Sequence, residues 1–265
     1  MTAPTAPTLA GRVTQTRVVR SEWTKFRSLR SSWWTIAVAV VLTLGVGTLV
    51  SYAAARESGS IGAPNYVAAR SEIGGVFAVL ALGVLGVLLI SGEYGTGMIR
   101  ASMAAVPKRL PVLWGKAAVY VALVLPISLV TSFVAFWLGQ LAWQGGGRDG
   151  VGLGDPEVAR IVVGSALYLT VAGLFGLALG ALLRNTAAAI TVLVGLFFVV
   201  PSIMQALPES IRDASRFLPS NAGASVANQS FSEHPLAPWP GFALLCAYTV
   251  ALLIAAAWRL RRTDV

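Results

Sequence analysis

Residues 33–55 read WWTIAVAVVLTLGVGTLVSYAAA, a run without a charged side chain. A helix needs about 20 apolar residues to cross the hydrocarbon core of a bilayer, so this run is long enough for one span. It begins with Trp33 and Trp34, and paired aromatic residues are typical of a helix end at the membrane interface. The stretch therefore predicts a transmembrane helix.

Five further runs have the same character, and together they predict an all-α integral membrane protein with six transmembrane helices. Backbone groups in lipid must hydrogen-bond within their own segment, which favours helices. Of the 265 residues, 56% are hydrophobic and only 12% are charged, and the mean hydropathy is +0.73. We expect a disordered tail at 1–11 and a single transmembrane domain at 12–265. The predicted spans are 33–55, 73–90, 116–141, 161–183, 187–204 and 240–258.

The charged residues are unevenly distributed about these spans. With the N-terminus inside, the inner segments carry fourteen of the twenty Lys and Arg residues but only three of the eleven Asp and Glu residues. Basic residues favour the cytoplasmic side, so both termini are predicted in the cytoplasm of a multi-pass plasma-membrane protein. This bias accounts for the net charge of +9 without a nucleic-acid partner. Membrane lipid is the expected partner of the basic face.

Two segments outside the spans have amphipathic patterns. Residues 18–33 gather apolar side chains on one helical side and basic ones towards the other, which predicts an N-terminal helix in the membrane interface. Glu22 intrudes on its apolar side. The second pattern predicts a short amphipathic outer helix before the last span. Its apolar stripe is Leu207, Ile211, Ala214 and Leu218.

Patterns for catalysis and metal binding are absent from the sequence. A single cysteine, Cys246, and a single histidine, His234, exclude a Cys/His metal cluster, so no metal site is predicted. The chain has no phosphate-binding G-x-x-x-x-G-K-[ST] motif. The predicted spans contain no acidic residue away from their ends, whereas ion-coupled transporters usually keep an ionisable group near the midplane. We therefore expect no catalytic residue, and an energy source outside the bilayer.

The loop after the second predicted span carries the most informative motif. Residues 93–100 read EYGTGMIR, residues 106–109 read VPKR, and Gly115–Lys116 open the third span. This pattern resembles the cytoplasmic loop of type-2 ATP-binding-cassette (ABC) permeases. Residues 20–28 likewise resemble the interface helix of actinobacterial members of that family. The six-span layout also fits, so the resemblance covers nearly the whole chain.

The resemblance implies the permease subunit of an ATP-driven exporter for a hydrophobic or amphipathic substrate such as a drug, lipid or peptide. Such permeases pair with a second copy or a paralogue and dock cytoplasmic ABC ATPase subunits. ATP and Mg would bind to the ATPase, and no cofactor to this chain. The implied ATPase-coupling residues are Glu93, Thr96, Gly97, Met98, Arg100, Lys108 and Arg109 in the loop, with Glu22 and Lys25 in the interface helix.

Glu93 ends a lipid-buried helix, so its charge needs a basic partner or water. Arg27, Arg30 and Arg100 are the candidate partners; the alternative is an ordinary boundary carboxylate in the headgroup zone. By the same resemblance, the substrate pathway between paired chains is assigned to a separate set of residues. These are Thr43, Phe77, Thr191, Phe197 and Phe198.

Two further questions stay open on the sequence alone. Gly173, Gly176 and Gly180 would serve close helix packing, either within the chain or between subunits. The alternative function is a non-transporting membrane anchor or regulator that recruits a cytoplasmic partner through the basic face. A membrane-embedded enzyme is disfavoured, because the acid–base and metal-binding residues that it would need are missing.

Overall fold

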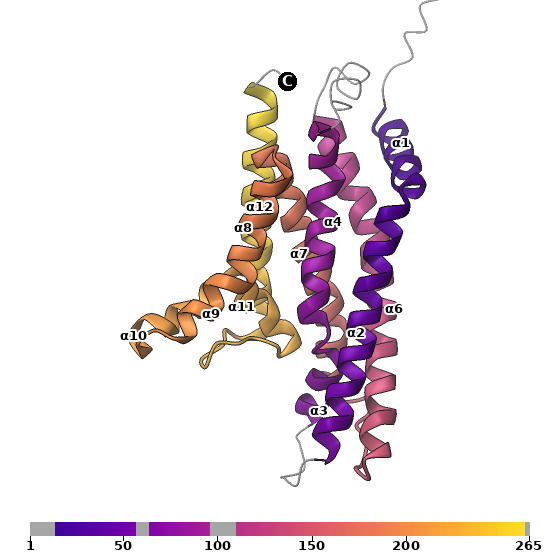
Figure 1. Cartoon of the computed structure of the whole chain (residues 1–265), viewed down its shortest axis with the longest axis vertical. Coiled ribbons are helices and arrows are strands. Elements are labelled where there is room, and N and C mark those ends of the chain that lie inside the picture. Colours follow the sequence, from indigo (N-terminus) through magenta and orange to yellow (C-terminus); the bar gives the residue numbers. More distant parts are fainter. Residues whose placement is uncertain (1–13, 57–63, 96–109, 263–265) are drawn as a thin grey trace, which may run out of the picture.

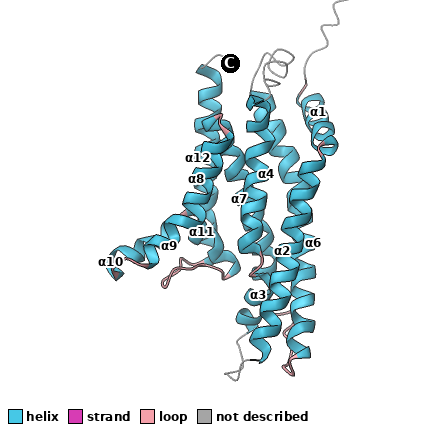
Figure 2. Ribbon diagram, in the orientation of Figure 1, coloured by secondary structure: helices cyan, strands magenta, loops and turns pink. Residues whose placement is uncertain are grey.

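The computed structural model describes residues 14–56, 64–95 and 110–262, and within these ranges every regular element is helical (Figure 2). Six helical stretches are long and apolar enough to cross a membrane, which confirms the predicted all-α membrane fold. The expected tail at 1–11 lies outside the described residues. The spans are α2 (Arg30–Arg56), α4 (Gly75–Gly95), α6 (Leu110–Gly145), α7 (Pro156–Leu183), the continuous stretch Thr186–Gln205, and α12 (Pro238–Arg262).

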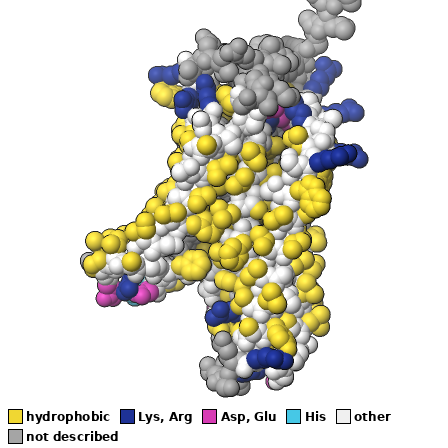
Figure 3. Space-filling view, in the orientation of Figure 1, with side chains coloured by type: hydrophobic (Ala, Val, Ile, Leu, Met, Phe, Trp, Pro, Cys, Tyr) yellow, Lys and Arg dark blue, Asp and Glu magenta, His cyan; other side chains and the backbone are white. Residues whose placement is uncertain are grey.

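The long helices form an elongated bundle whose two described chain ends lie at the same end of the bundle (Figure 1). The N-terminal helix α1 (Gln15–Ser28) and the C-terminal end of α12 are both at this end, as an even number of crossings requires. Hydrophobic side chains cover the middle of the visible face, and Lys and Arg gather mainly at the end that holds α1 (Figure 3). Lipid, which is as apolar as these side chains, explains why they remain exposed.

α7 is the central helix and packs against α4, α6 and α12. Its closest neighbour is α4, which it approaches through glycines. A Cβ atom on Gly176 would overlap the backbone of Gly83, and one on Gly173 would overlap the Tyr120 hydroxyl. A Cβ on Gly180 would lie 2.9 Å from the backbone oxygen of Val87. The glycines singled out in the sequence therefore lie in contacts within the chain.

A short buried helix comes directly before the second span. The short helix α3 (Pro64–Glu72) precedes α4 and packs against α2, α6 and α7, so it belongs to the bundle. The turn at Ile73 and Gly74 separates the two helices, and a Cβ on Gly74 would overlap the backbone of Leu42 on α2. Glu72, at the end of α3, is fully buried. Glu72 lies before the second span, so the bundle buries an acid while the six spans hold no acidic residue away from their ends, as the sequence predicts.

The fifth span bends away from the bundle. It consists of α8 (Thr186–Val194), the π-helical turn η1 (Gly195–Val199) and α9 (Val200–Gln205), and it leads to an arm that projects sideways (Figure 1). The segment that follows α9 is divided into short helices, one of which begins at Pro219 after an extended Leu218. These are α10 (Glu209–Arg212), η2 (Asp213–Phe217), α11 (Pro219–Ala224) and η3 (Ser225–Ala227).

Candidate functional site

The helix α1 packs one face against the start of α6. Val18, Glu22 and Phe26 recur every fourth residue, and all three are buried on that face. Gly115 on α6 allows the close approach, since a Cβ there would meet Val18 Cγ1 at 3.1 Å. Glu22, which interrupts the apolar pattern, therefore lies within the contact between α1 and α6.

Glu22 belongs to a group of two acids and two lysines, Glu22, Lys25, Glu93 and Lys116, which we call the four-charge cluster. Lys116 Nζ lies 2.6 Å from Glu22 Oε2 and 2.8 Å from Glu93 Oε1. Lys25 Nζ lies 2.8 Å from Glu22 Oε1 and 3.0 Å from Glu93 Oε1. Each lysine therefore bridges both carboxylates, and the cluster joins α1, the end of α4 and the start of α6.

Most of the four-charge cluster is removed from solvent. The side chains of Lys116 and Glu22 are 2% and 4% exposed, whereas that of Lys25 is 34% exposed. A lone buried charge costs several kcal/mol, but each charge here faces two opposite ones and the formal charges cancel. Burial by itself lowers the pKa of Lys25, but its hydrogen bonds with Glu22 and Glu93 outweigh burial and raise that pKa. Lys25 therefore stays charged at neutral pH.

A cavity of about 350 Å³ opens beside the cluster, between α1, α2 and α4. Phe26, Leu85 and Leu89 contribute an apolar wall, and all four residues of the four-charge cluster also line the cavity. Hydroxyl groups from the junction of α1 and α2 line the remainder. Those hydroxyls belong to Ser28, Ser31, Ser32 and Thr35. The cavity thus offers an apolar wall and polar groups to a single occupant.

The structure brings together Glu22, Lys25 and Glu93, three of the residues that the sequence assigned to coupling. Arg27 and Arg30 are exposed and form no ion pair with Glu93, so they are wrong as its partners. The remaining assigned residues, and the third candidate partner Arg100, lie outside the described residues. They are Thr96, Gly97, Met98, Arg100, Lys108 and Arg109.

Lys116 is the functional residue that sequence reasoning missed, because it was noted only as the start of the third span. A signal was present. Lysine inside a membrane-spanning helix is expensive unless a partner neutralises it. Lys116 lies six residues after Leu110, where the helix begins. The sequence could thus have indicated a paired lysine, but not which acids pair with it.

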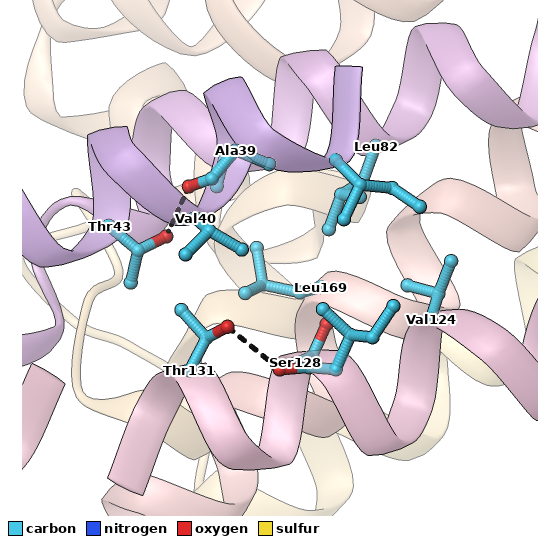
Figure 4. Close-up of a pocket in the computed structure, with 11 residues that line it drawn as sticks. Ala39, Val40, Thr43, Leu82, Val124, Ser128, Thr131 and Leu169 are labelled. Atoms are coloured by element: carbon cyan, nitrogen blue, oxygen red, sulfur yellow. Dashed lines mark hydrogen bonds between the residues drawn. The ribbon is translucent and has the colours of Figure 1, made fainter. Parts of the chain in front are cut away.

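Thr43, a predicted pathway residue, lies inside the chain. It lines a narrow cavity of about 10 Å³ between α2, α4 and α6 (Figure 4). Its hydroxyl donates to the carbonyl oxygen of Ala39 at 2.9 Å, and Ser128 and Thr131 of α6 lie across the cavity. This space holds about one water molecule, so it is too small for a transported molecule.

The other four predicted pathway residues are dispersed. Phe197 is buried against Phe175, with 5.4 Å between the ring centroids, and Phe198 is half-buried beside a separate small cavity. Phe77 on α4 and Thr191 on α8 are exposed on the surface of the chain. Within the described residues, one chain alone therefore does not gather the five into one channel.

A bundle of six membrane-crossing helices, tied together at one end by buried charges, is the architecture of a multi-pass membrane protein. Residues 62–258 match the family model described as ABC-2 family transporter protein. Because the match covers more than half of the chain, the chain belongs to this family, whose members are permease components of ABC transporters. The family pairs generally with an ABC ATPase and is not catalytic by itself. No curated protein matches the chain.

Proposed function

We propose that this chain is the permease subunit of an ATP-driven exporter, and that the four-charge cluster transmits motion from the ATPase to the membrane helices. The observation that carries the proposal is the ion pair between Glu93 and Lys116, 2.8 Å long. These two residues flank the loop 96–109 at the end of α4 and the start of α6. Glu22 and Lys25 attach α1 to both. A partner that moves the loop therefore moves three helices together.

The proposed orientation places the loop and both termini in the cytoplasm of a plasma-membrane protein. It is supported by the excess of Lys and Arg at the end of the bundle that holds α1 (Figure 3). An ATPase carrying ATP and Mg would dock at this end. The loop residues Thr96, Gly97, Met98, Arg100, Lys108 and Arg109 remain the predicted docking residues.

The proposed transporter contains a second permease chain, either identical or a paralogue. Support comes from the distribution of the predicted pathway residues, because Phe77 and Thr191 are exposed on α4 and α8. These two helices pack against each other, so the exposed residues can face a common partner. In this arrangement a pathway forms between the chains rather than within one chain.

The proposed substrate is amphipathic, and it moves out of the cytoplasm. The 350 Å³ cavity beside the four-charge cluster supports this class of substrate, because ligand sites of this size typically combine apolar walls with a few polar groups. Ser32 and Thr35 could meet a polar headgroup while Leu85 and Leu89 meet its hydrocarbon part.

Purification of the tagged full-length chain from its native membrane tests the proposal. A cassette ATPase should co-purify, and its ATP hydrolysis in lipid vesicles should depend on the permease. Recovery of the chain without an ATPase, together with binding only to vesicles that contain anionic lipid, would contradict the exporter and favour the membrane anchor.

A further inference from the structure

Glu72 is a fully buried carboxyl far from the four-charge cluster. It ends α3, directly before the second span, and is 0% exposed. Ser132 of α6, one of its neighbours, lies sixteen residues beyond Lys116, which corresponds to about 24 Å along a helix. Glu72 therefore lies towards the opposite end of the bundle, and coupling to the ATPase loop does not explain it.

The surroundings of Glu72 are polar but neutral. The hydroxyls of Ser132 on α6 and Ser165 on α7 lie close enough to act on the carboxyl. Neither carboxyl oxygen meets full hydrogen-bond geometry with a described neighbour, and the same holds for both serine hydroxyls. The amide of Gln229 donates to the backbone oxygen of Glu72 at 2.8 Å, and so leaves the side chain unpaired.

No described cation compensates Glu72. The nearby charged groups on α2, α3 and α7 either contact other groups or are exposed to the surface. Helix α6 carries no charged residue between Ala117 and Gly145. Two of these groups are arginines that lie over a tyrosine ring of their own helix. A third arginine donates a hydrogen bond to the backbone oxygen of Val226. The carboxylate of Glu157 is exposed. The three arginines are Arg56 on α2, Arg70 on α3 and Arg160 on α7.

The chemistry of this site selects its ligand. An ionised carboxylate buried without a cation costs far more than a neutral carboxylic acid, which can also donate a hydrogen bond to a hydroxyl. A hard metal ion would need about six oxygen ligands, whereas Ser132 and Ser165 provide two hydroxyls. A proton requires no additional ligands and no additional space.

We propose that Glu72, with Ser132 and Ser165, forms a proton-binding site at the break between α3 and α4. While α3 packs against α6 and α7, as in the structure, the carboxyl keeps its proton beside the two serine hydroxyls. When α3 separates from α6 and α7 and water reaches the site, the O–H bond breaks and the proton passes to water. Gln229 connects this break to the segment that follows η3, so both parts respond to the change.

Infrared spectroscopy of the purified full-length chain at neutral pH tests the site directly. A protonated carboxylic acid has a carbonyl band that is separate from carboxylate bands and shifts in D₂O. We expect this band in the wild type and in the control Glu157→Gln, and its loss in Glu72→Gln. Absence of the band from the wild type would overturn the proposal even if Glu72→Gln does not fold. Loss of carboxylate bands in Glu72→Gln would also overturn it.

The pH dependence of unfolding gives a second readout, independent of any ATPase. The unfolded chain releases the proton that the folded chain retains. The folding equilibrium constant of the wild type should therefore fall as the pH rises above the range in which an exposed carboxyl titrates, by up to about tenfold per pH unit. Glu72→Gln should lack this component and Glu157→Gln should retain it. Equal pH slopes in all three proteins would refute the proton site.

Discussion

At the scale of single residues, the four-charge cluster shows how a charge can be kept in a membrane bundle. Lys116 is buried almost completely, yet its ammonium group meets two carboxylates at hydrogen-bond distance. Replacing such a group by an apolar one leaves the partner charges buried and uncompensated, which is costlier than the original pairing. The stability of the bundle and the proposed transmission of motion from the loop therefore depend on the same contacts.

Lys116→Met should destabilise the folded chain by about 3–5 kcal/mol, the usual cost of removing one partner from a buried ion pair. Denaturant unfolding in detergent measures this change. Lys25→Met is the matched control, because it removes the other bridging lysine, whose side chain is one-third exposed. Its loss of stability should be clearly smaller. An equal loss in both variants would show that burial of Lys116 has no special importance.

The raised pKa of Lys25 predicts how α1 responds to pH. A group whose pKa is raised by folding stabilises the fold below its ordinary value and loses that effect as the pH rises through the folded value. Contact between α1 and the bundle should thus be constant near neutral pH and weaken only above about 10.5, the ordinary value for lysine. The fluorescence of Trp23 on α1 reports this contact. A transition near neutral pH would contradict the assignment.

Individual residues were predictable only where a local pattern marks them. Glu22 is conspicuous because it interrupts an apolar helical face, and Glu93 because it ends an apolar run. Their common partner Lys116 is 94 residues from Glu22, and no local pattern reports such a pairing. In the proposed transporter the pathway residues depend on how two chains meet, which the pattern of one chain does not contain.

At the scale of helices, the contact between α4 and α7 is the closest in the bundle. Glycines stand at this contact, and because they have no side chain the backbones of the two helices come close together. Helix packing in lipid gains little from the hydrophobic effect and depends on such close contact. The contact should therefore tolerate no added volume.

Gly176→Ala should destabilise the chain by about 1–3 kcal/mol, because the new Cβ would overlap the backbone of Gly83. Gly45→Ala on α2 is the matched control, since a Cβ there has nothing within 4 Å. That control should be neutral or slightly stabilising, as alanine favours helix more than glycine does. Denaturant unfolding compares the two. A neutral Gly176→Ala would contradict the packing described for α4 and α7.

The helices were predictable because lipid imposes their length and apolar character, and all six appear close to the expected positions. The short buried helix α3, directly before the second span, was not. Ile73 and Gly74 interrupt the helix for only two residues, and the polar residues of α3 resemble an outer loop. The burial of Glu72 therefore emerged only from the packing of α3 against three other helices.

At the scale of the whole molecule, coupling to a cytoplasmic ATPase requires that the charge-rich end of the bundle faces the cytoplasm. In a variant carrying Cys246→Ser, a cysteine introduced by Asp149→Cys should react with a membrane-impermeant maleimide in intact cells. A cysteine introduced by Arg262→Cys should react only after permeabilisation, because it lies at the other end of α12 from the outer segment. The reverse pattern would invert the orientation.

In the proposed transporter the four-charge cluster couples the ATPase to the bundle. ATP hydrolysis by the co-purified complex in lipid vesicles measures this coupling. Glu93→Gln should still assemble but lose permease-dependent ATP hydrolysis on the order of tenfold, a typical coupling between sites. Glu157→Gln, which removes an exposed carboxylate at the other end of the bundle, should match the wild type. Wild-type hydrolysis by an assembled Glu93→Gln complex would contradict the account.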